Sequence, residues 1–571
     1  MSSTDWIVLI VTLAGIIMYG LYKSRSEKNL ESYFLQNRSS RWYMILLGIM
    51  GTQASAVTFL SAPGQAYTDG MRFVQYYFGL PLAMVVLCVT FVPVFHKLKL
   101  FTAYEFLEKR FDGKTRTFTS LLFLLQRGLS TGISISAPSI ILSSLLGWDI
   151  LWTNILMGGL LIIYTVTGGA KAVAYTQQIQ FVIIFAGMLM AGYMVVHLLP
   201  ARIGLSDALH IGGKAGKLNV ITSGVDEKGF NWNDRYNMWS GVIGGFFLAL
   251  SYFGTDQSQV GRYLTAKSVR DSRLGLLMNG LVKVPMQFGI LLIGTLVFSY
   301  YQFAKEPLFF NQTQIELLSK TKYADSLKIV LKEHDHLQQR KVAQMNPSGG
   351  MRLENRMQEG LVMQQAQADQ LRLRTTIKRW LNDKEVKGNS NDTNYIFLRF
   401  VIDHLPQGLI GLLIAVIFLS AWGSVAASLN ALSSATINDI HKRMIKKPLE
   451  AEKEYQYSQW YTLAWGIFCV VIAQLAYNIG NSLIEAVNVL GSLFYGVILG
   501  IFLVAFYIKK ITATPVFISA LITETFVITI HVLNQKEIIN ISFLWLNAIG
   551  AIGMIVLSAI FQKFKRMADD R

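Results

Sequence analysis

Long apolar stretches separated by shorter polar ones recur along the chain. Many of them have about 20 residues, the length that an α-helix needs to cross the ~30 Å hydrocarbon core of a membrane. The apolar positions run continuously and do not alternate, which excludes a transmembrane β-barrel. The pattern therefore predicts an all-α, polytopic membrane protein.

The apolar pattern predicts thirteen membrane spans, which are listed here in chain order. They cover approximately 4–23, 42–66, 72–96, 117–146, 150–168, 176–199, 237–263, 274–302, 406–437, 458–478, 482–509, 513–533 and 542–562.

One long polar segment, residues 303–397, separates the eighth predicted span from the ninth. Two parts of this insertion have a helical pattern, and "PSGG" between them predicts a turn. We expect a solvated helical hairpin that caps the outer face of the protein. A docking module for a protein partner at 304–396, or a ligand sensor, is the alternative.

Basic residues are concentrated in the loops that the span count places on one side of the membrane. These are 24–41, 97–116, 438–455 and the tail "KFKRMADDR", whereas the opposite side has one basic loop, 200–236. Cytoplasmic loops of membrane proteins carry an excess of Lys and Arg. We therefore expect the N-terminus outside and the C-terminus in the cytoplasm. The net charge of +17 is explained in the same way, without a nucleic-acid partner.

Composition supports a lipid-embedded chain and gives no sign of catalysis. Hydrophobic residues make up 52% and charged residues 15%, whereas a soluble chain carries about 25% charged residues. The only two cysteines, Cys88 and Cys469, lie in apolar spans and predict packing, with no disulfide framework. The sequence has no His/Cys metal cluster, nucleophile elbow or phosphate loop, so we expect no enzyme.

Two of the predicted spans are interrupted by small and polar residues. "GTQASAVTFLSAPGQAY" (Gly51–Tyr67) breaks the second span, and "GGFFLALSYFGTDQ" (Gly244–Gln257) breaks the seventh. Irregular backbone is tolerated in a membrane where it lines a buried polar cavity. If spans two to six and seven to eleven form two sets of five, the breaks fall at matching places. This predicts an inverted repeat with a binding site at mid-membrane. Close helix crossings through glycine are the alternative.

The ninth span is unusually rich in hydroxyl and amide side chains. "FLSAWGSVAASLNALSSATINDI" (Phe418–Ile440) holds five serines, a threonine and two asparagines. Such residues join membrane helices by hydrogen bonds. A serine hydroxyl with carbonyls also suits a hard cation such as sodium.

These motifs resemble those of the sodium:solute symporter family, which has a LeuT-like core of five plus five helices. The resemblance rests on "ASAVTFLSAPGQAYTDG", "GGAKAVAYTQQIQ", "YFGTDQSQVGRYLTAKS", "SVAASLNALSSATINDIHK" and "TAYEFLEKRF". It covers most of the chain outside the insertion and implies sodium-coupled symport by alternating access. "SAVT" is similar to members that move monocarboxylates or sialic acids.

The resemblance implies that the chain is divided into four parts. These are an extra N-terminal helix and loop (1–41), core helices one to five (42–199), core helices six to ten (237–509, interrupted by 303–397) and two C-terminal helices with a short tail (510–571).

The sodium site implied by the family consists of carbonyls at the first break and groups of the ninth span. They fall on Gly51, Ala54, Ser420, Gly423 and Ser424. Gly423 departs from the family pattern because it has no hydroxyl, so a water or the Ser420 hydroxyl must complete the shell. Some members hold a further sodium ion, and the places of its ligands are Gln177, Ala426 and Ala427 here. We therefore expect one sodium ion per cycle.

The implied solute contacts come from several core helices. They fall on Gln53, Ser55, Thr58, Tyr76, Tyr77, Tyr252, Phe253, Lys283 and Glu485. Sugar-transporting members have a glutamine, a glutamate and an asparagine where this chain has Thr58, Tyr77 and Ala249, so the sugar pattern is largely missing.

Three ionisable residues lie inside predicted spans, which makes them functional candidates. Arg127 is suited to a bidentate contact with a carboxylate and joins the solute contacts. An ion pair with Glu485 or a helix-end carbonyl contact is its alternative role. For Lys283 we favour a structural hydrogen bond near the site. A carboxylate at Glu485 would repel an anionic solute; binding of sugar hydroxyls or an amine, or neutralisation of Arg127, are its alternative roles.

The sequence therefore predicts sodium-driven import of a small organic acid or an acidic sugar such as sialic acid, through a bacterial inner membrane. A sodium/sugar or polyol symporter is an alternative, and so is a sensor that acts through the outer insertion. Proton coupling through Glu485 is a further variant.

Overall fold

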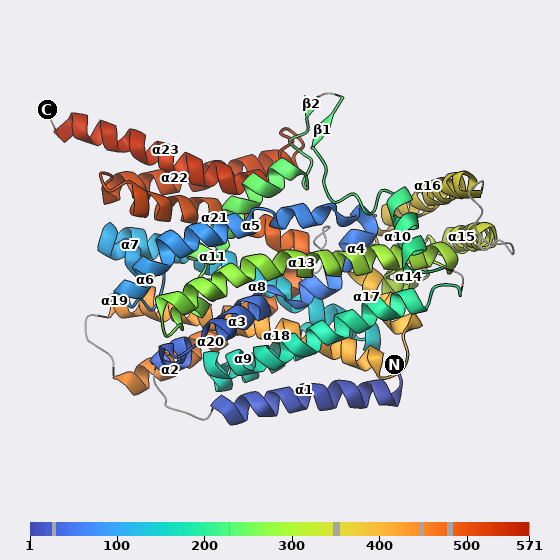
Figure 1. The fold of residues 1–571 in the computed structure, drawn as a ribbon, viewed down its shortest axis with the longest axis horizontal. Coiled ribbons are helices and arrows are strands. Elements are labelled where there is room, and N and C mark those ends of the chain that lie inside the picture. The colour runs from blue at the N-terminus through green and yellow to red at the C-terminus, as the bar shows by residue number, and fades with distance from the viewer. Residues whose placement is uncertain are drawn as a thin grey trace.

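The computed structural model describes residues 1–24, 30–201, 203–227, 229–345, 355–386, 388–445, 450–476 and 483–569. Nearly all regular structure in these ranges is helical, and long helices lie side by side along the molecule (Figure 1). This confirms the all-α, polytopic fold.

The first part of the chain forms the helices that precede and build the first predicted repeat. They are α1 (Ser3–Ser24), α2 (Leu30–Leu35), η1 (Gln36–Arg38), α3 (Trp42–Gln53), α4 (Ala56–Asp69), η2 (Met71–Tyr77), α5 (Leu80–Val86), η3 (Leu87–Phe91), α6 (Val92–Leu98), α7 (Glu105–Arg110), α8 (Gly113–Leu146) and α9 (Ile150–His197). α9 contains two of the predicted spans, 150–168 and 176–199, which correspond to the apolar segments Ile150–Thr167 and Val173–His197 of the structure.

The middle of the chain begins with an outer loop and ends in a long helix. Its elements are α10 (Leu205–Lys214), β1 (Val225–Asp226), β2 (Gly229–Phe230), η4 (Ser240–Gly244), α11 (Gly245–Thr255), α12 (Gln257–Leu264) and α13 (Val269–Phe303). β1 and β2 form an antiparallel hairpin in which Val225 faces Phe230 and Asp226 faces Gly229.

The insertion and the rest of the chain are again helical. The elements are α14 (Gln312–Leu318), α15 (Ala324–Met345), α16 (Asn355–Leu381), α17 (Thr393–His404), α18 (Leu409–Ala435), η5 (Thr436–His441), α19 (Lys442–Met444), α20 (Ala451–Ala476), α21 (Leu483–Tyr507), α22 (Ala513–Gln535) and α23 (Phe543–Asp569).

Within the described residues, eleven helices are long and apolar enough to cross a membrane, and the bent pair α3 and α4 makes twelve. The remaining predicted span, the seventh (237–263), is a shorter apolar helix over Ser240–Thr255 followed by α12. All thirteen predicted segments are therefore helical, although this one is too short to pass as a continuous span.

Both predicted interruptions are breaks in the structure. α3 and α4 meet at an angle of 60°, and Ala54 between them has ψ 70°, which no helix continues through. Asp256 separates α11 from α12 with an extended backbone (φ −78°, ψ 116°). Its carboxylate caps α12 by accepting a hydrogen bond from the Ser258 N–H at 2.8 Å. The small and polar residues of the two stretches thus end one helix and begin another.

The insertion forms a separate body at one end of the molecule, where α15 and α16 lie side by side (Figure 1). It has its own apolar core, whose fully buried members include Leu318, Ile377 and Leu381. The two helices of the expected hairpin are present and packed together, while its "PSGG" turn lies outside the described residues.

The insertion is fastened to the outer half of the broken span. Tyr67 of α4 donates a hydrogen bond to Glu306, and the Ser61 hydroxyl donates to Asn394 Oδ1 at 2.7 Å. Lys341 of α15 donates to the Tyr301 carbonyl at 2.8 Å and lies 3.4 Å from Glu306. α4 is therefore held by polar contacts from a segment far away in the sequence.

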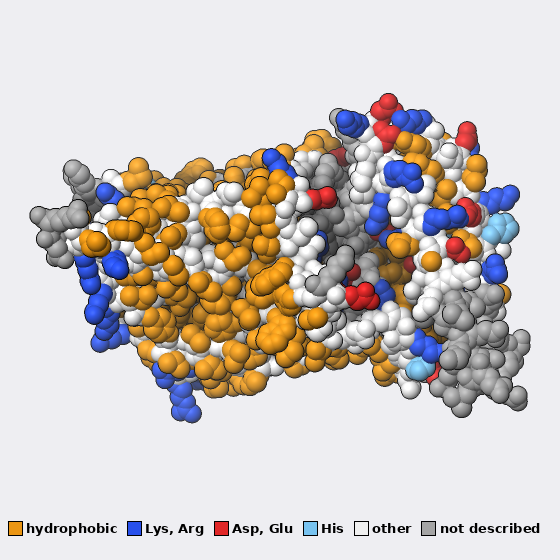
Figure 2. Space-filling view, turned by 90° about the horizontal axis from the view of Figure 1, so that it is seen from above, with side chains coloured by type: hydrophobic (Ala, Val, Ile, Leu, Met, Phe, Trp, Pro, Cys, Tyr) orange, Lys and Arg blue, Asp and Glu red, His pale blue; other side chains and the backbone are white. Residues whose placement is uncertain are grey.

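The surface is divided as a membrane requires. Figure 2 shows hydrophobic side chains covering the body of the molecule, with charged ones on the insertion and Lys and Arg at the opposite end. The N-terminus lies at the end of the insertion and the C-terminus at the other end (Figure 1). The protein is therefore a multi-pass membrane protein.

Candidate functional site

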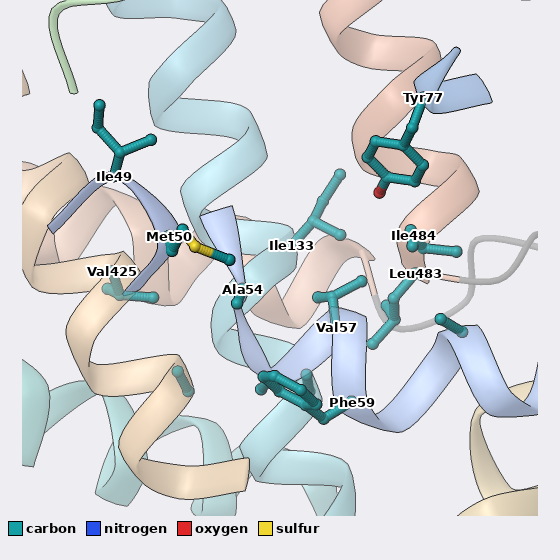
Figure 3. Close-up of a cluster of buried hydrophobic side chains, with 14 of the residues drawn as sticks. Ile49, Met50, Ala54, Val57, Phe59, Tyr77, Ile133, Val425, Leu483 and Ile484 are labelled. Carbon is teal, nitrogen blue, oxygen red and sulfur yellow. The ribbon is translucent and has the colours of Figure 1, made fainter. Parts of the chain in front are cut away.

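A cavity of about 130 Å³ lies where the two broken spans approach each other. Its walls come from both halves of the broken α3–α4 span and from η2, α8, α11, α18 and α21. Figure 3 shows the apolar part of this region, with Met50, Ala54 and Val57 around the break and Val425 and Ile484 opposite. The break therefore opens into a buried space inside the helix bundle.

Eight of the ten predicted solute contacts line this cavity. They are Gln53, Ser55, Thr58, Tyr76, Tyr77, Arg127, Tyr252 and Phe253. Residues from four separate predicted spans are thus brought together, as the inverted-repeat interpretation expects. Ala249, the third position of the missing sugar pattern, also lines the cavity beside Thr58 and Tyr77.

Arg127 is paired with an acid that the sequence analysis did not single out. Its Nη2 lies 2.5 Å from Asp256 Oδ2 and donates to the Ser258 hydroxyl at 2.7 Å. The expected alternative partner, Glu485, is therefore wrong, because the capping carboxylate at the second break is nearer. The Arg127 Nε is buried and has no partner among the described residues. Tyr495 also donates to Asp256 Oδ2, at 2.6 Å.

Lys283 lies behind the cavity wall. Its side chain is fully buried, and its Nζ has no hydrogen-bond partner in the described part of the chain. The expected structural hydrogen bond is therefore wrong. The ammonium group instead lies 5.3 Å from the centre of the Tyr77 ring, a cation–π contact. Lys283 can therefore affect a bound solute only through Tyr77.

Glu485 lies beside the site and is absent from the cavity lining. Its carboxylate accepts a hydrogen bond from Arg235, a residue of the loop before η4. Its neighbours Ile484 and Asn488 do line the cavity. The negative charge at Glu485 is therefore balanced by Arg235, and it does not confront a solute directly.

Among the described residues, no hydrogen bond reaches the Gly51 or Ala54 carbonyl, the predicted sodium ligands at the first break. The last carbonyls of a helix have no helical N–H partner, and α3 ends at Gln53. The Thr58 hydroxyl bonds the Gln53 carbonyl at 3.4 Å. Gly51 and Ala54 are buried beside these groups. Backbone oxygen is thus available at the break for a hard cation.

The predicted ligands on α18 face the same region. Ser424 lines the cavity and donates its hydroxyl hydrogen to the Ala421 carbonyl at 3.1 Å. The Ser420 hydroxyl donates to the Ile417 carbonyl at 2.8 Å. Each hydroxyl oxygen keeps lone pairs that can contact a cation.

Gln177 of α9 lies between the two halves of the predicted sodium site. Its Nε2 donates to the Gly423 carbonyl at 2.9 Å, and its Oε1 is buried without a partner among the described residues. A Cβ on Gly51 would meet the Gln177 side chain at 3.2 Å, and one on Gly423 would meet Gln180 Oε1 at 2.8 Å. The glycines thus make room for two glutamines.

The cavity contains polar residues that the sequence analysis missed. Gln126, Asn488 and Tyr495 line it, and Gln126 Oε1 and Asn488 Nδ2 have no partner in the described structure. Gln126 directly precedes Arg127, and Asn488 follows Glu485 by one helical turn. A search for amides beside the intramembrane charges would have found both residues.

Comparison with known proteins identifies relatives of this chain. The profile of the sodium:solute symporter family matches residues 33–316 and 378–523. The sodium/sialic acid symporter SiaT of Proteus mirabilis is 24% identical over 560 residues, which cover 97% of this chain and 94% of the relative. The human sodium-coupled monocarboxylate transporter 1 is 30% identical over 282 residues, which cover 48% of this chain and 44% of the relative.

A solved structure agrees in fold. It is described as the substrate-bound, outward-open state of a Na⁺-coupled sialic acid symporter, and it covers 99% of this chain and 98% of its own. The TM-score is 0.74 at 22% sequence identity. The profile match takes in both broken spans, the cavity and α18, while its gap falls within the insertion. The chain belongs to the sodium:solute symporter family and is a sodium-coupled symporter of a small organic solute.

Proposed function

We propose that this symporter imports a small organic acid, with an acidic sugar such as sialic acid as the leading candidate. The observation that carries this proposal is the Arg127 guanidinium, which lines the cavity and keeps its Nε without a partner in the described structure. Guanidinium is the group best suited to hold a carboxylate.

The ion pair with Asp256 leaves room for this role. One nitrogen of Arg127, Nη2, bonds both Asp256 and Ser258. A solute carboxylate that bonds Nε adds a charge-assisted hydrogen bond without breaking these contacts. Because Arg235 balances Glu485, the nearest other carboxylate does not repel such a solute.

The remaining free groups of the cavity suit a solute with hydroxyl or amide substituents. Gln53 Oε1 and Gln126 Oε1 are unpartnered acceptors, and Asn488 Nδ2 is an unpartnered donor, within the described residues. A buried polar group without a partner costs free energy, so a solute that pairs with it gains affinity. An acidic sugar offers several such pairs, whereas a short carboxylate offers few.

Several relatives transport substrates of this charge type. Among them, two are named for sialic acid, two for monocarboxylates and one for iodide, while two others are named for multivitamins. The first three kinds of substrate are anions at neutral pH. Their names support an anionic solute for this chain.

We propose one sodium ion per cycle, bound by the Gly51 and Ala54 carbonyls and by Ser420 and Ser424 of α18. Gln177 Oε1 supplies the oxygen that Gly423 lacks, since the Gln177 side chain lies against both glycines and this buried amide oxygen has no partner in the described structure. Inward movement of one positive charge releases about 2.3 kcal/mol per 100 mV of membrane potential.

Uptake into proteoliposomes tests the substrate class. With an inward sodium gradient, we expect accumulation of N-acetylneuraminic acid or a short carboxylate, and none of hexose or inositol. Replacing sodium by potassium removes uptake. Arg127→Met lowers the rate at least tenfold, and Arg127→Lys does so as well, since a point charge does not reproduce the planar fork.

Arg399→Gln is the control, because Arg399 pairs with Asp403 on α17, away from the cavity. It keeps wild-type uptake. Sodium-driven uptake of a neutral hexose that survives Arg127→Met would contradict the proposal. Uptake driven by pH in the absence of sodium would contradict the sodium assignment instead.

We further propose that the protein lies in a bacterial inner membrane with the insertion and the N-terminus outside. The Lys- and Arg-rich end opposite the insertion in Figure 2 supports this orientation.

A further inference from the structure

A second, smaller cavity of about 30 Å³ lies beside α12, between α2 and α18. Its lining includes Ser258, whose hydroxyl accepts from Arg127, so it begins just behind the Arg127–Asp256 pair. A cavity needs about 10–15 Å³ for each water that it holds. This space therefore holds about two waters or one halide ion. It is too small for a sugar.

Arg262 of α12 lines this cavity as a buried cation that has no acidic partner among the described residues. The residue is 7% exposed. Its Nε donates to the Thr52 hydroxyl at 3.2 Å, and across the described ranges the guanidinium makes no other hydrogen bond or ion pair. A buried charge is strongly unfavourable unless it is paired. The remaining nitrogens of Arg262 therefore need a negative partner.

Asn430 of α18 supplies an independent sign of an unfilled site in the same cavity. Its side chain is 5% exposed, and neither its Oδ1 nor its Nδ2 has a partner in the part of the chain that the structure describes. Buried amides are nearly always hydrogen-bonded. Two unsatisfied groups, one charged and one able to donate, thus face one small space.

We propose that this second cavity binds a small anion such as chloride, held by the Arg262 guanidinium and the Asn430 amide. A cation is excluded because Arg262 repels it. Water alone satisfies the hydrogen bonds but leaves the charge of Arg262 unbalanced. An anion satisfies the hydrogen bonds and also balances this charge.

The second cavity is connected to the proposed sodium site through one hydroxyl. Thr52 Oγ1 accepts from Arg262 Nε and also from Gln177 Nε2, at 3.3 Å. Thr52 directly follows Gly51, and Gln177 is a neutral amide, so neither offsets the positive charge of Arg262. An anion in the second cavity therefore strengthens sodium binding. This step rests on the sodium site of the proposed function.

Sodium titrations of the purified full-length protein, followed by its thermal unfolding midpoint, test this link. The titrations are run in chloride and in gluconate, which is too large for the cavity, at constant ionic strength. We expect the apparent sodium affinity to be at least threefold tighter in chloride. Arg262→Gln removes the difference between the salts, and the control Arg399→Gln keeps it.

Asn430→Asp serves as a second variant, which matters if Arg262→Gln does not fold. It places a carboxylate in the cavity with almost no change in shape. We expect the same tight sodium affinity in both salts, because the fixed charge replaces the anion.

Bromide-soaked crystals of the wild type locate the anion directly. We expect an anomalous peak within hydrogen-bond distance of Arg262. Equal sodium affinity in both salts, together with no such peak, overturns the proposal. A bromide peak with equal sodium affinity supports the anion site and overturns its link to sodium, which places the fault in the sodium assignment.

Discussion

At the scale of single residues, the structure explains why position 423 is a glycine. The sequence leaves this position without a hydroxyl for sodium, and in the structure the space of a side chain there is filled by Gln177 and Gln180. We expect Gly423→Ser to weaken the apparent sodium affinity by about tenfold, roughly 1.4 kcal/mol. The new Cβ lies 2.8 Å from Gln180 Oε1 and displaces the glutamines.

Sodium-dependent uptake measured at increasing sodium concentrations checks this expectation. Gln177→Ala creates space, so combining it with Gly423→Ser should cost less than the sum of the two single changes. Tighter sodium binding in Gly423→Ser alone would show that the hydroxyl is the preferred ligand and that Gln177 is not one.

The insertion carries a pH-sensitive residue, His334 of α15. Burial lowers the pKa of its imidazole to about 4, below the ~6.5 of an exposed histidine. Because the unfolded state binds the proton more tightly, stability is complete above pH 6.5 and falls as the pH drops towards 4. We expect a loss of at most about 2 kcal/mol between pH 7.5 and pH 5.

His334→Gln should reduce this loss in melting curves recorded across that pH range, measured on the full-length protein. His336→Gln is the matched control, since His336 lies on the same helix with an exposed side chain. An unchanged pH slope in His334→Gln would assign the acid sensitivity to another group.

The contacts of single residues also show which parts of the site could be predicted from the sequence and which could not. The solute contacts on the broken spans could be predicted because their motifs are local, and they do line one cavity. The ion-pair partners of the charged residues could not be predicted. Arg127 meets Asp256 129 residues away, and Arg235 meets Glu485 250 residues away. Such pairs depend on which helices are neighbours, which a single sequence does not state.

At the scale of elements, α13 packs against the broken span through a glycine. A Cβ on Gly294 would lie 2.1 Å from the carbonyl oxygen of Pro63 in α4, and backbone cannot yield as a side chain does. We expect Gly294→Ala to force α13 and α4 apart, at a cost of about 1–3 kcal/mol. Thermal unfolding and sodium-driven uptake should both report the change.

Gly289→Ala provides the control on the same helix, because a Cβ there meets nothing within 4 Å. It should keep or slightly raise the melting temperature, since alanine favours a helix over glycine. Equal effects of the two substitutions would mean that helix propensity, and not the contact with Pro63, decides the outcome.

The insertion depends on one buried ion pair near its junction with α17. Asp392 is 1% exposed, accepts from the Phe310 N–H at 2.8 Å and lies 2.6 Å from Arg374 Nη2. Asp392→Ala leaves Arg374 buried without its partner, so we expect a loss of about 3 kcal/mol. The exposed pair of Asp325 with Lys328 offers a control, and Asp325→Ala should change stability by less than about 1 kcal/mol. Similar melting temperatures for the two variants would contradict this.

The elements themselves were largely predictable, because glycine, proline and hydroxyl residues inside apolar stretches mark the breaks of α3–α4 and α11–α12. The break at Asp256 shows which feature could not be predicted. Its carboxylate is both the cap of α12 and the partner of Arg127, and a capping aspartate is common enough in sequences to suggest only a helix start.

At the scale of the whole molecule, the termini lie at opposite ends (Figure 1). We expect the end with the insertion to face outwards. Single cysteines introduced by Ser3→Cys, Glu316→Cys and Asp569→Cys test this, because these positions are exposed while the native Cys88 and Cys469 are buried. In intact cells, a membrane-impermeant maleimide should label the first two variants and spare the third. Labelling of the third alone would reverse the orientation.

The insertion has a practical consequence for imaging. Most of the surface of this 64.0 kDa chain is apolar and would be covered by a detergent micelle. A helix bundle inside a micelle offers few features for aligning particles in electron microscopy. α15 and α16 project from one end, with their own core and polar ties to α4. They form a built-in fiducial that reports the position of the outer half of the broken span, so conformational classes could be sorted without an added antibody fragment.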